Sequence, residues 1–272
     1  MARILDNLVT LKKIIRRKPF GLITDMDGTL SEIPHDFLQK TAPPSTLLQL
    51  AQLLNHFDLV AVISGRRTEA LKDIVNIEGV KYIGNYGMER WENNQAVLHP
   101  DVTASLSSMR AVAKELEALR SIEGMIIQDK WATMSVHYHM SPQPEIAKQQ
   151  ILDLLEKSPH IKNMRLMDEK TNIGIVPRVD INKGTAVASL IKEYHLKGAL
   201  CLGDDIGDVP GFKAIRQARK NKTFGGLALL VTGPETTQDI LSEADFTLDG
   251  VEETEILLNW LIDNTTTRTL NP

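Results

Sequence analysis

Two blocks of alternating short apolar runs and amphipathic segments, one at each end of the chain, place the strongest constraint on the fold. In the first block, strands are expected at 20–24, at 59–63 and near 82–83, with helices at 47–54 and 69–75 between them. Short buried strands that alternate with helices are typical of a parallel sheet covered by helices on both faces. The block therefore predicts an α/β fold built on a doubly wound parallel sheet.

The end of the chain repeats this rhythm, whereas the middle does not. Strands are predicted at 199–202, 227–231 and 246–248, and helices at 183–194, 209–219, 237–243 and 253–262. The middle reads as helix, two strands, helix, two strands, at 100–119, 125–127, 134–139, 144–155, 164–167 and 173–176. That order is typical of an α+β layer. We expect a core of residues 1–88 and 178–272, with an inserted α+β domain at 89–177.

Composition limits the classes of partner. The 272 residues provide for one large domain or two modest ones. A net charge of -4 argues against a nucleic-acid binder, and no apolar stretch approaches the roughly 20 residues of a membrane span. The single cysteine, Cys201, suits a reducing compartment. We expect a cytoplasmic protein; a monomer is compatible with the sequence. The basic amphipathic segment 1–18 fits a helix packed on the domain better than one lying on a membrane.

Polar side chains follow the predicted strands of both blocks. Asp25 and Asp27 follow the first strand and Ser64 the second, while Lys183 opens a helix and Asp204 follows the next strand. The carboxyl ends of neighbouring parallel strands meet at one edge of the sheet, where such folds bind ligands. Adjacent carboxylates repel, which indicates a cation or a shared proton between them. Carboxylates can hold Mg²⁺, and a hydroxyl and an ammonium can hold the oxygens of a phosphoryl group.

The order of these motifs resembles that of the haloacid dehalogenase-like phosphatase superfamily. The matching residues are Asp25-Met26-Asp27-Gly28-Thr29, Ser64, Lys183 and Gly203-Asp204-Asp205. An α+β insertion between the second and third motifs resembles the type 2 cap of that superfamily. The resemblance implies that Asp25 is a nucleophile that forms an aspartyl-phosphate and that Asp27 acts first as general acid and then as base.

The same resemblance implies roles for the remaining polar residues. Ser64 and Lys183 would stabilise charge on the transferring oxygens. Mg²⁺ would be bound by the carboxylates of Asp25 and Asp204 and by the main-chain carbonyl of Asp27. Two alternatives stay open for the neighbouring aspartates. In one, Asp208 binds a water molecule on the metal; in the other, Asp205 orients Lys183. Thr29 is expected to fix the turn or to hydrogen-bond Asp27.

Finer features resemble the trehalose-6-phosphate phosphatase family. The segments that carry this resemblance are 25–33, 63–66, 84–89, 128–130 and 135–139. It implies an Mg²⁺-dependent phosphatase whose substrate is a sugar phosphate. Residues of the inserted domain would grip the sugar, with Glu89 and Lys130 as candidate sugar contacts and Arg66 near the cap interface.

Several positions depart from that family's pattern and leave the sugar open. Gln128 stands where an acidic residue is usual, Tyr86 where a His is usual and His139 where an Arg is usual, and the strand before Pro177 carries Gly174 and Val176 in place of Glu and Arg. One alternative is a phosphatase of another glycosyl phosphate, such as a sucrose, glucosylglycerol or mannosylglycerate precursor. The others are a phosphomutase and a non-catalytic sugar-phosphate binder, the latter disfavoured because a binder does not need paired carboxylates.

Overall fold

The computed structural model describes residues 1–33, 42–168, 172–234 and 236–265, and the chain divides into two units. The first unit comprises Met1–Ala96 and Ile181–Pro272, and the second comprises Val97–Asp180. The second unit begins later than the position expected from the sequence, because strands β4 (Glu89–Glu92) and β5 (Gln95–Leu98) extend the sheet of the first unit.

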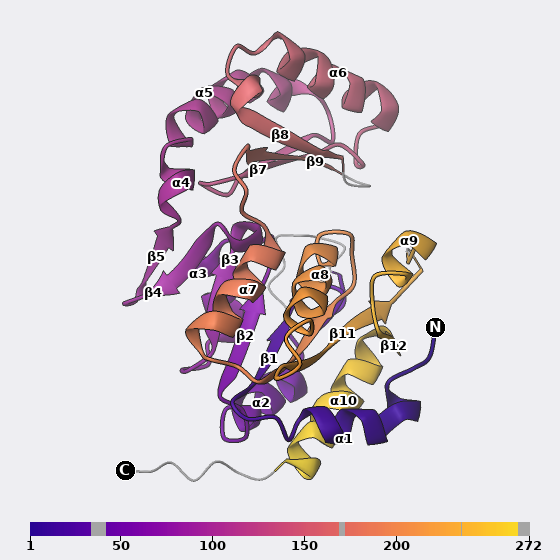
Figure 1. The fold of residues 1–272 in the computed structure, drawn as a ribbon. Coiled ribbons are helices and arrows are strands. Elements are labelled where there is room, and N and C mark those ends of the chain that lie inside the picture. The colour runs from indigo at the N-terminus through magenta and orange to yellow at the C-terminus, as the bar shows by residue number, and fades with distance from the viewer. Residues whose placement is uncertain (34–41, 169–171, 235, 266–272) are drawn as a thin grey trace. The chain divides into compact units, whose positions relative to one another are not determined.

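A central sheet organises the first unit (Figure 1). Within the described residues its eight strands have the order β12-β11-β10-β1-β2-β3-β4-β5. Neighbours from β12 through β3 are parallel, and β4 pairs antiparallel with β3. The parallel strands are β1 (Phe20–Thr24), β2 (Leu59–Ile63), β3 (Lys81–Gly84), β10 (Gly198–Gly203), β11 (Gly225–Thr232) and β12 (Phe246–Asp249). The predicted α/β class is confirmed.

Helices cover both faces of this sheet (Figure 1). One face packs against α1 (Leu8–Ile14), α2 (Pro44–Leu53), α3 (Thr68–Val75) and α10 (Gly250–Asn264). The other packs against α7 (Lys183–Glu193), α8 (Val209–Ala218) and α9 (Gln238–Leu241). On β10, Leu200 and Leu202 belong to the first core and Ala199 and Cys201 to the second, because successive side chains point to opposite faces.

The basic N-terminal segment is a packed helix, as predicted. A 3₁₀ turn at Leu5–Asn7 leads into α1, whose Leu11 is fully buried in the core, while Lys12 and Lys13 are exposed. No helix in the described part of the chain is long and apolar enough to cross a membrane.

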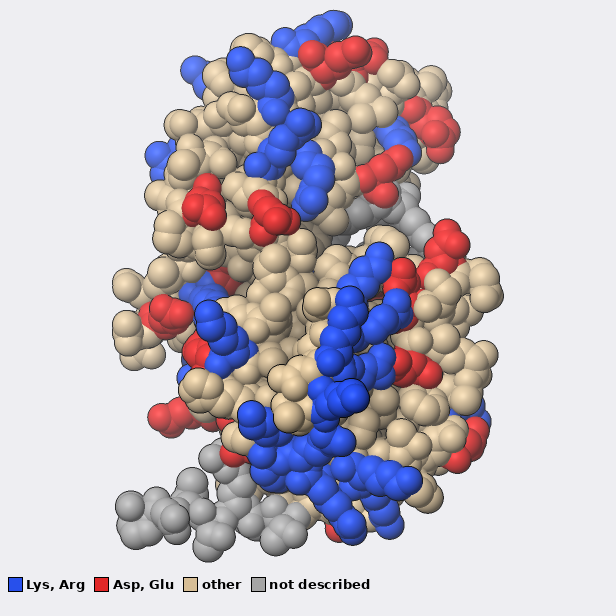
Figure 2. All heavy atoms as spheres, in the orientation of Figure 1, with Lys and Arg blue, Asp and Glu red and all other residues tan. Residues whose placement is uncertain are grey.

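Basic side chains gather in a band over α8 and α1 on the face seen in Figure 2. On α8, Lys213 and Arg216 pair with Glu243 at 3.2 and 3.0 Å, and Arg219, which follows α8, pairs with Asp245 at 2.8 Å. Part of the positive charge of this band is therefore neutralised by carboxylates of the same unit.

The second unit has a four-stranded antiparallel sheet in the order β6-β7-β9-β8 with helices on one face. Its elements are α4 (Pro100–Thr103), α5 (Leu106–Leu116), η3 (Glu117–Ser121), β6 (Ile126–Asp129), β7 (Met134–His137), α6 (Pro144–Lys157), η4 (Ile161–Asn163), β8 (Met164–Asp168) and β9 (Asn172–Pro177). The single helix predicted at 100–119 is wrong: Ala104 and Ser105 separate α4 from α5, and the 3₁₀ segment η3 follows α5.

The hairpin of β4 and β5 was not predicted. Asn93 and Asn94 form the two-residue connection between the strands, at φ of 51° and 61°. Asn is among the few residues that adopt this left-handed conformation readily, and a two-residue hairpin turn of type I′ needs it at both positions. The Asn-Asn pair was therefore an available signal, which the weak alternation of the flanking residues obscured.

Candidate active site

A buried ammonium between two carboxylates forms the centre of the candidate site. Lys183 Nζ lies 2.8 Å from Asp25 Oδ1 and 2.7 Å from Asp208 Oδ1, and all three side chains are buried. Burial lowers the pKa of Lys183, but the charges of Asp208 and Asp25 outweigh it and raise that pKa well above its usual value. Lys183 is therefore a fixed positive charge beside Asp25.

The sheet brings Asp25 and Asp204 together. Strands β1 and β10 are parallel neighbours with Thr24 opposite Leu202, and the backbone N–H of Asp25 donates to the carbonyl of Leu202 at 3.0 Å. The residues that follow the two strands consequently leave the same edge of the sheet side by side. This is the convergence expected for strand ends in a parallel sheet.

A helix cap positions Lys183. Asn182 is the N-cap of α7, and its side-chain oxygen accepts from the backbone N–H groups of Gly184 and Thr185. The Thr185 hydroxyl accepts in return from the backbone N–H of Asn182, which completes a reciprocal capping arrangement. Lys183 therefore stands at the first position of a well-defined helix, with its side chain directed to the carboxylates.

The turn after β1 packs against the side chain of Asp204. The Thr29 hydroxyl donates to Asp204 Oδ1 at 3.2 Å, so its partner is not Asp27, one of the two roles expected from the sequence. Gly28 has φ of 79°, and a Cβ atom there would clash with the Asp204 carboxylate. Glycine is thus required both by the backbone conformation and by the close approach of the carboxylate.

Three carboxylates of the site fit a divalent cation. Asp25, Asp204 and Asp208 each offer an oxygen, and these atoms lie within 4.8 Å of one another. Lys183 supplies one positive charge against three carboxylates, which leaves excess negative charge in a largely buried site. Burial raises the pKa of Asp25 to about 7 and that of Asp204 to about 8. A hard divalent cation with oxygen ligands would remove this imbalance.

These pKa values predict that cation binding strengthens with pH. A carboxyl group with a raised pKa is protonated below that pKa and must release its proton before it binds a metal. From about pH 6 to about pH 8 the apparent dissociation constant of Mg²⁺ should therefore fall, by up to about tenfold per pH unit for each proton released. Thermal denaturation across a Mg²⁺ series at each pH measures this. An apparent dissociation constant that does not change with pH would contradict it.

Asp208 orients Lys183, whereas the alternative from the sequence gave that role to Asp205. Asp208 Oδ2 accepts from the backbone N–H groups of Asp204 at 3.0 Å and Asp205 at 3.3 Å, while its Oδ1 accepts from Lys183. The Asp205 carboxylate accepts from the backbone N–H of Gly207 at 2.8 Å. Asp208 thus ties the turn after β10 to α7.

Asp27 lies in a different pair. Its carboxylate oxygens accept from Arg66, Oδ2 from Nε at 2.6 Å and Oδ1 from Nη2 at 2.7 Å. Its side chain does not belong to the cluster of Asp25, Asp204 and Asp208. A role for Asp27 as a metal ligand would therefore rest on its main-chain carbonyl, and that role stays a prediction.

Ser64 follows β2, the strand next to β1, and is buried. Its backbone N–H donates to the carbonyl of Ile83 at 3.0 Å, and its hydroxyl oxygen accepts from the backbone N–H of Arg66 at 3.2 Å. The structure therefore holds Ser64 at the same edge of the sheet as Asp25.

Glu89 has an environment that sequence reasoning did not anticipate. The side chain is 0% exposed, and Oε2 accepts from the backbone N–H of Thr68 at 3.2 Å and from Asn85 Nδ2 at 2.7 Å. Burial raises the pKa of Glu89, although its hydrogen bonds with Thr68 oppose this. Thr68 is the first residue of α3, where an acceptor for a backbone N–H stabilises the helix. We therefore propose that Glu89 positions this segment; its contact with the sugar stays a prediction.

Two substitutions at Glu89 separate these roles. Glu89→Ala leaves a buried backbone donor and the Asn85 amide without this acceptor, so the free energy of unfolding should fall by about 2–3 kcal/mol. Glu89→Gln keeps an acceptor, so its free energy of unfolding should fall by less than about 1 kcal/mol. Chemical denaturation measures both, and steady-state kinetics measures KM. A large rise in KM for Glu89→Gln, with little loss of stability for Glu89→Ala, would instead support a sugar contact.

In the second unit, two of the departures from the family pattern, Gln128 and Gly174, lie in one row across the sheet. Gln128 on β6 lies opposite Ser135 on β7, which lies opposite Gly174 on β9. Along each strand, the residues next to this row point to the other face of the sheet. There Ile127, Val136 and the other core residues pack against the helices. Lys130 follows β6, in a turn where its backbone N–H donates to the carbonyl of Thr133 at 2.9 Å.

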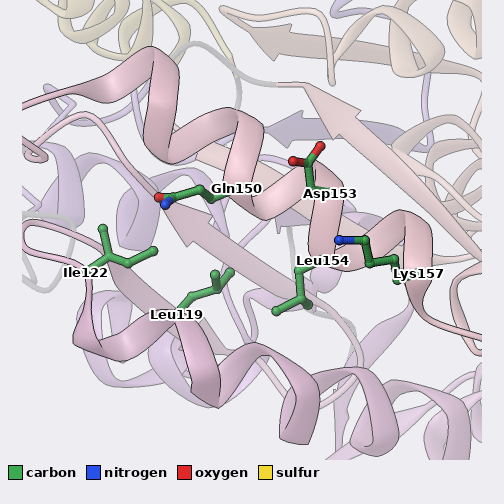
Figure 3. A pocket seen from close by; sticks show the side chains of 6 residues that line it. All are labelled: Leu119, Ile122, Gln150, Asp153, Leu154 and Lys157. Atoms are coloured by element: carbon green, nitrogen blue, oxygen red, sulfur yellow. The ribbon is translucent and has the colours of Figure 1, made fainter.

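A hollow on the helical side of the second unit is a separate feature (Figure 3). Its volume is about 350 Å³. It lies between the segment that carries Leu119 and Ile122 and helix α6, and Figure 3 shows Gln150, Asp153 and Lys157 along the α6 side. None of the site residues predicted from the sequence lines it.

The carboxylate edge of the parallel sheet and the α+β insertion are features of the haloacid dehalogenase-like hydrolases, and this chain is a member of that superfamily. More narrowly, the chain belongs to the trehalose-phosphatase family, whose sequence profile matches residues 23–244. That family consists of phosphatases, which hydrolyse phosphoric monoesters. The resemblance seen in the sequence is thereby confirmed.

Named relatives agree with this assignment. The chain is 26% identical over 264 residues to a trehalose-phosphate phosphatase of Mycobacterium leprae, covering 92% of this chain and 59% of that protein. It is 25% identical over 227 residues to a probable trehalose-phosphate phosphatase of Sinorhizobium fredii, covering 82% and 81%. The chain thus spans little more than half the length of the first relative.

A solved structure has the same fold. The C-terminal domain of trehalose-6-phosphate phosphatase from Candida albicans superposes with a TM-score of 0.80 at 20% identity, covering 96% of this chain and 98% of that one. At this level of identity the likeness concerns the fold, including the doubly wound core and the inserted domain.

Proposed function

We propose that this chain is an Mg²⁺-dependent phosphatase that hydrolyses a sugar phosphate, with trehalose 6-phosphate as the substrate. The observation that carries the proposal is the Lys183 ammonium held between Asp25 and Asp208, beside Asp204. This arrangement suits attack by a carboxylate on a phosphoryl group whose charge must be balanced. Family membership and the names of the relatives support the choice of substrate.

The proposed reaction has two steps. A carboxylate oxygen of Asp25 attacks phosphorus, the bond from phosphorus to the sugar oxygen breaks, and Asp27 gives its proton to the leaving oxygen. Asp27 then takes a proton from water, whose oxygen bonds to phosphorus while the bond to Asp25 breaks. Phosphate is released, and both aspartates return to their starting states.

Charge stabilisation comes from groups around Asp25. Lys183 and Ser64 would contact the non-bridging oxygens of the phosphoryl group, where negative charge is concentrated throughout the transfer. Mg²⁺, held by Asp25, Asp204 and Asp208, would supply further positive charge when bound. In the absence of substrate, Lys183 and the hydrogen bonds to Asp208 keep these groups in place.

One observation favours a second candidate, a phosphatase of another glycosyl phosphate. Gln128 and Gly174, which depart from the family pattern, lie in one row across three strands of the inserted domain. Replacing charged groups by an amide and by a glycine changes which sugar hydroxyls find a partner. Unpaired polar groups in a buried site discriminate strongly between substrates.

Phosphate release from a panel of sugar phosphates tests both candidates. The panel comprises trehalose 6-phosphate, glucose 6-phosphate and other glycosyl phosphates, each assayed with Mg²⁺ and with chelator. We expect trehalose 6-phosphate to have the highest kcat/KM and chelator to abolish activity. If it is turned over no faster than glucose 6-phosphate, the substrate proposal fails, and a faster glycosyl phosphate supports the second candidate. Rearrangement of the ester without net phosphate release would indicate a phosphomutase.

A further inference from the structure

The pair of Asp27 and Arg66 engages both oxygens of the proposed acid/base. Arg66 Nε and Nη2 donate to Asp27 Oδ2 and Oδ1 at 2.6 and 2.7 Å, which is the two-pronged geometry in which a guanidinium matches a carboxylate. The Arg66 side chain is 18% exposed and that of Asp27 is 26% exposed. The pair is therefore partly shielded from water and fixes the plane of the carboxylate.

Arg66 comes from a segment that is itself held in place. Its backbone N–H donates to Ser64 Oγ at 3.2 Å, and its carbonyl accepts from the backbone N–H of Asn85 at 2.8 Å. Two residues later, the N–H of Thr68 donates to the buried Glu89. A loop tied at these points presents the guanidinium from a defined position.

The residue before Arg66 adds to this rigidity. A Cβ atom at Gly65 would lie 2.6 Å from the ring of Tyr86, so the loop packs directly on that ring. Tyr86 in turn donates its backbone N–H to the carbonyl of Ser64 at 3.0 Å. The loop that carries Arg66 is thus packed as well as hydrogen-bonded.

This geometry has a chemical consequence for Asp27. A general acid or base transfers a proton through one of its carboxylate oxygens, and the reacting atom must lie within hydrogen-bond reach of that oxygen. With both oxygens bound to Arg66, the carboxylate is directed at the guanidinium. To act as general acid, Asp27 must first take up a proton from water on one oxygen. That oxygen then gives up its bond to Arg66 and faces the sugar oxygen, while the other continues to be held.

Arg66, the partner of Asp27, also lies close enough to the proposed nucleophile Asp25 to interact with its charge. The pKa of Arg66 is raised chiefly by its hydrogen bonds with Asp27, and the charge of Asp25 contributes as well. A phosphoryl group at Asp25 would bring additional anionic oxygens near this guanidinium. The guanidinium has several N–H donors, so it can stay bonded to one oxygen of Asp27 while the other oxygen turns toward the reacting group.

We propose that Arg66 is a positioning residue that aims the Asp27 carboxylate, holding it by both oxygens before the reaction and by one during proton transfer. This inference rests on the proposed function, in which Asp27 is the acid/base. It gives Arg66 a role through Asp27, different from the place near the cap interface that was expected from the sequence.

Arg66→Lys tests the role because lysine keeps the charge but lacks the fork that binds two oxygens. We expect kcat for phosphate release to fall by about 10²-fold, with KM changed by less than about threefold, since the affected group acts in the transition state. Arg90→Lys is the matched control. Arg90 is also a partly buried arginine of the first unit, and its fork contacts Glu193 at 2.9 Å and Ser189 Oγ at 3.0 Å. It should retain the wild-type kcat.

A double-mutant cycle separates action through Asp27 from action on the substrate. Asp27→Asn and the double variant are compared on an aryl phosphate, whose good leaving group keeps the slow rates measurable. If Arg66 acts through Asp27, Arg66→Lys should reduce the rate of Asp27→Asn by less than about twofold. Full additivity, a wild-type kcat for Arg66→Lys, or an effect confined to KM would overturn the inference. Failure of the wild-type protein to release phosphate would instead overturn the proposed function.

Discussion

Asp25→Asn is expected to release phosphate from sugar phosphates at less than about 10⁻⁴ of the wild-type kcat, because a neutral amide does not replace an attacking carboxylate. Lys183, Asp204 and Asp208 remain in the variant, so the loss isolates the nucleophile. Phosphate release at saturating substrate measures the rate. Rapid acid quench followed by mass spectrometry should find a phosphorylated peptide containing residue 25 in the wild-type protein only. A variant that keeps substantial activity would exclude the aspartyl-phosphate mechanism.

Stability distinguishes this loss from misfolding. Burial raises the pKa of Asp25 to about 7, although Lys183 opposes this. A carboxyl group with a raised folded-state pKa contributes stability below its usual pKa, and that contribution is lost as the pH rises through about 7. Asparagine does not ionise, so metal-free Asp25→Asn should match the wild type at about pH 4 and exceed it at about pH 8 by on the order of 3 kcal/mol. Denaturant unfolding in chelator measures this, and lower stability at the higher pH would contradict it.

The sequence predicted the centre of the fold because the signals there are local and strong. The strands β1, β2, β10 and β11 are nearly continuous apolar runs, as expected for strands buried on both faces. The β4–β5 hairpin lies at the end of the sheet, where residues are half-exposed and the alternation is weak. Its position also explains why the boundary of the inserted unit lies beyond residue 89.

The sequence also predicted which residue types meet at the sheet edge, since strand ends converge whatever their side chains. It did not predict their partners. Asp27 pairs with Arg66 and Lys183 with Asp208, and each pair joins segments far apart in the chain. Such pairing depends on loop conformation and rotamers, which periodicity and motif spacing do not encode.

Glu89 is a second residue whose surroundings the sequence did not predict, because a charged side chain is buried there. A charged residue next to a motif is expected to be exposed or to contact a ligand. Here the run of positive φ angles at Asn85, Tyr86 and Gly87 (49°, 58° and 107°) turns the chain so that Glu89 enters the interior beside the start of α3. The need for that turn is visible in the sequence only as an Asn and a Gly. The buried acceptor that it delivers becomes visible only in the structure.

Lys183→Met is expected to lower both activity and stability. Without the ammonium, Asp25 and Asp208 lose the cation that lies 2.8 and 2.7 Å from their oxygens. Removing one partner of a buried ion pair leaves uncompensated charge, so the free energy of unfolding in chelator should fall by about 3–5 kcal/mol. The transferring phosphoryl group also loses a positive charge, and kcat should fall by about 10³-fold. Denaturant unfolding and phosphate release measure the two effects.

Mg²⁺ should separate these two effects of Lys183→Met, because a cation among the carboxylates restores charge balance without restoring the ammonium at the phosphoryl oxygens. Saturating Mg²⁺ should therefore recover a larger share of the lost stability in Lys183→Met than it adds to the wild type, while kcat stays low. Lys192→Met is the matched control, since Lys192 lies on the same helix and is exposed. If Lys183→Met were as stable in chelator as Lys192→Met, the buried ion pairs would not hold the site together. If Mg²⁺ also restored its kcat, Lys183 would act only by balancing charge and not on the transferring group.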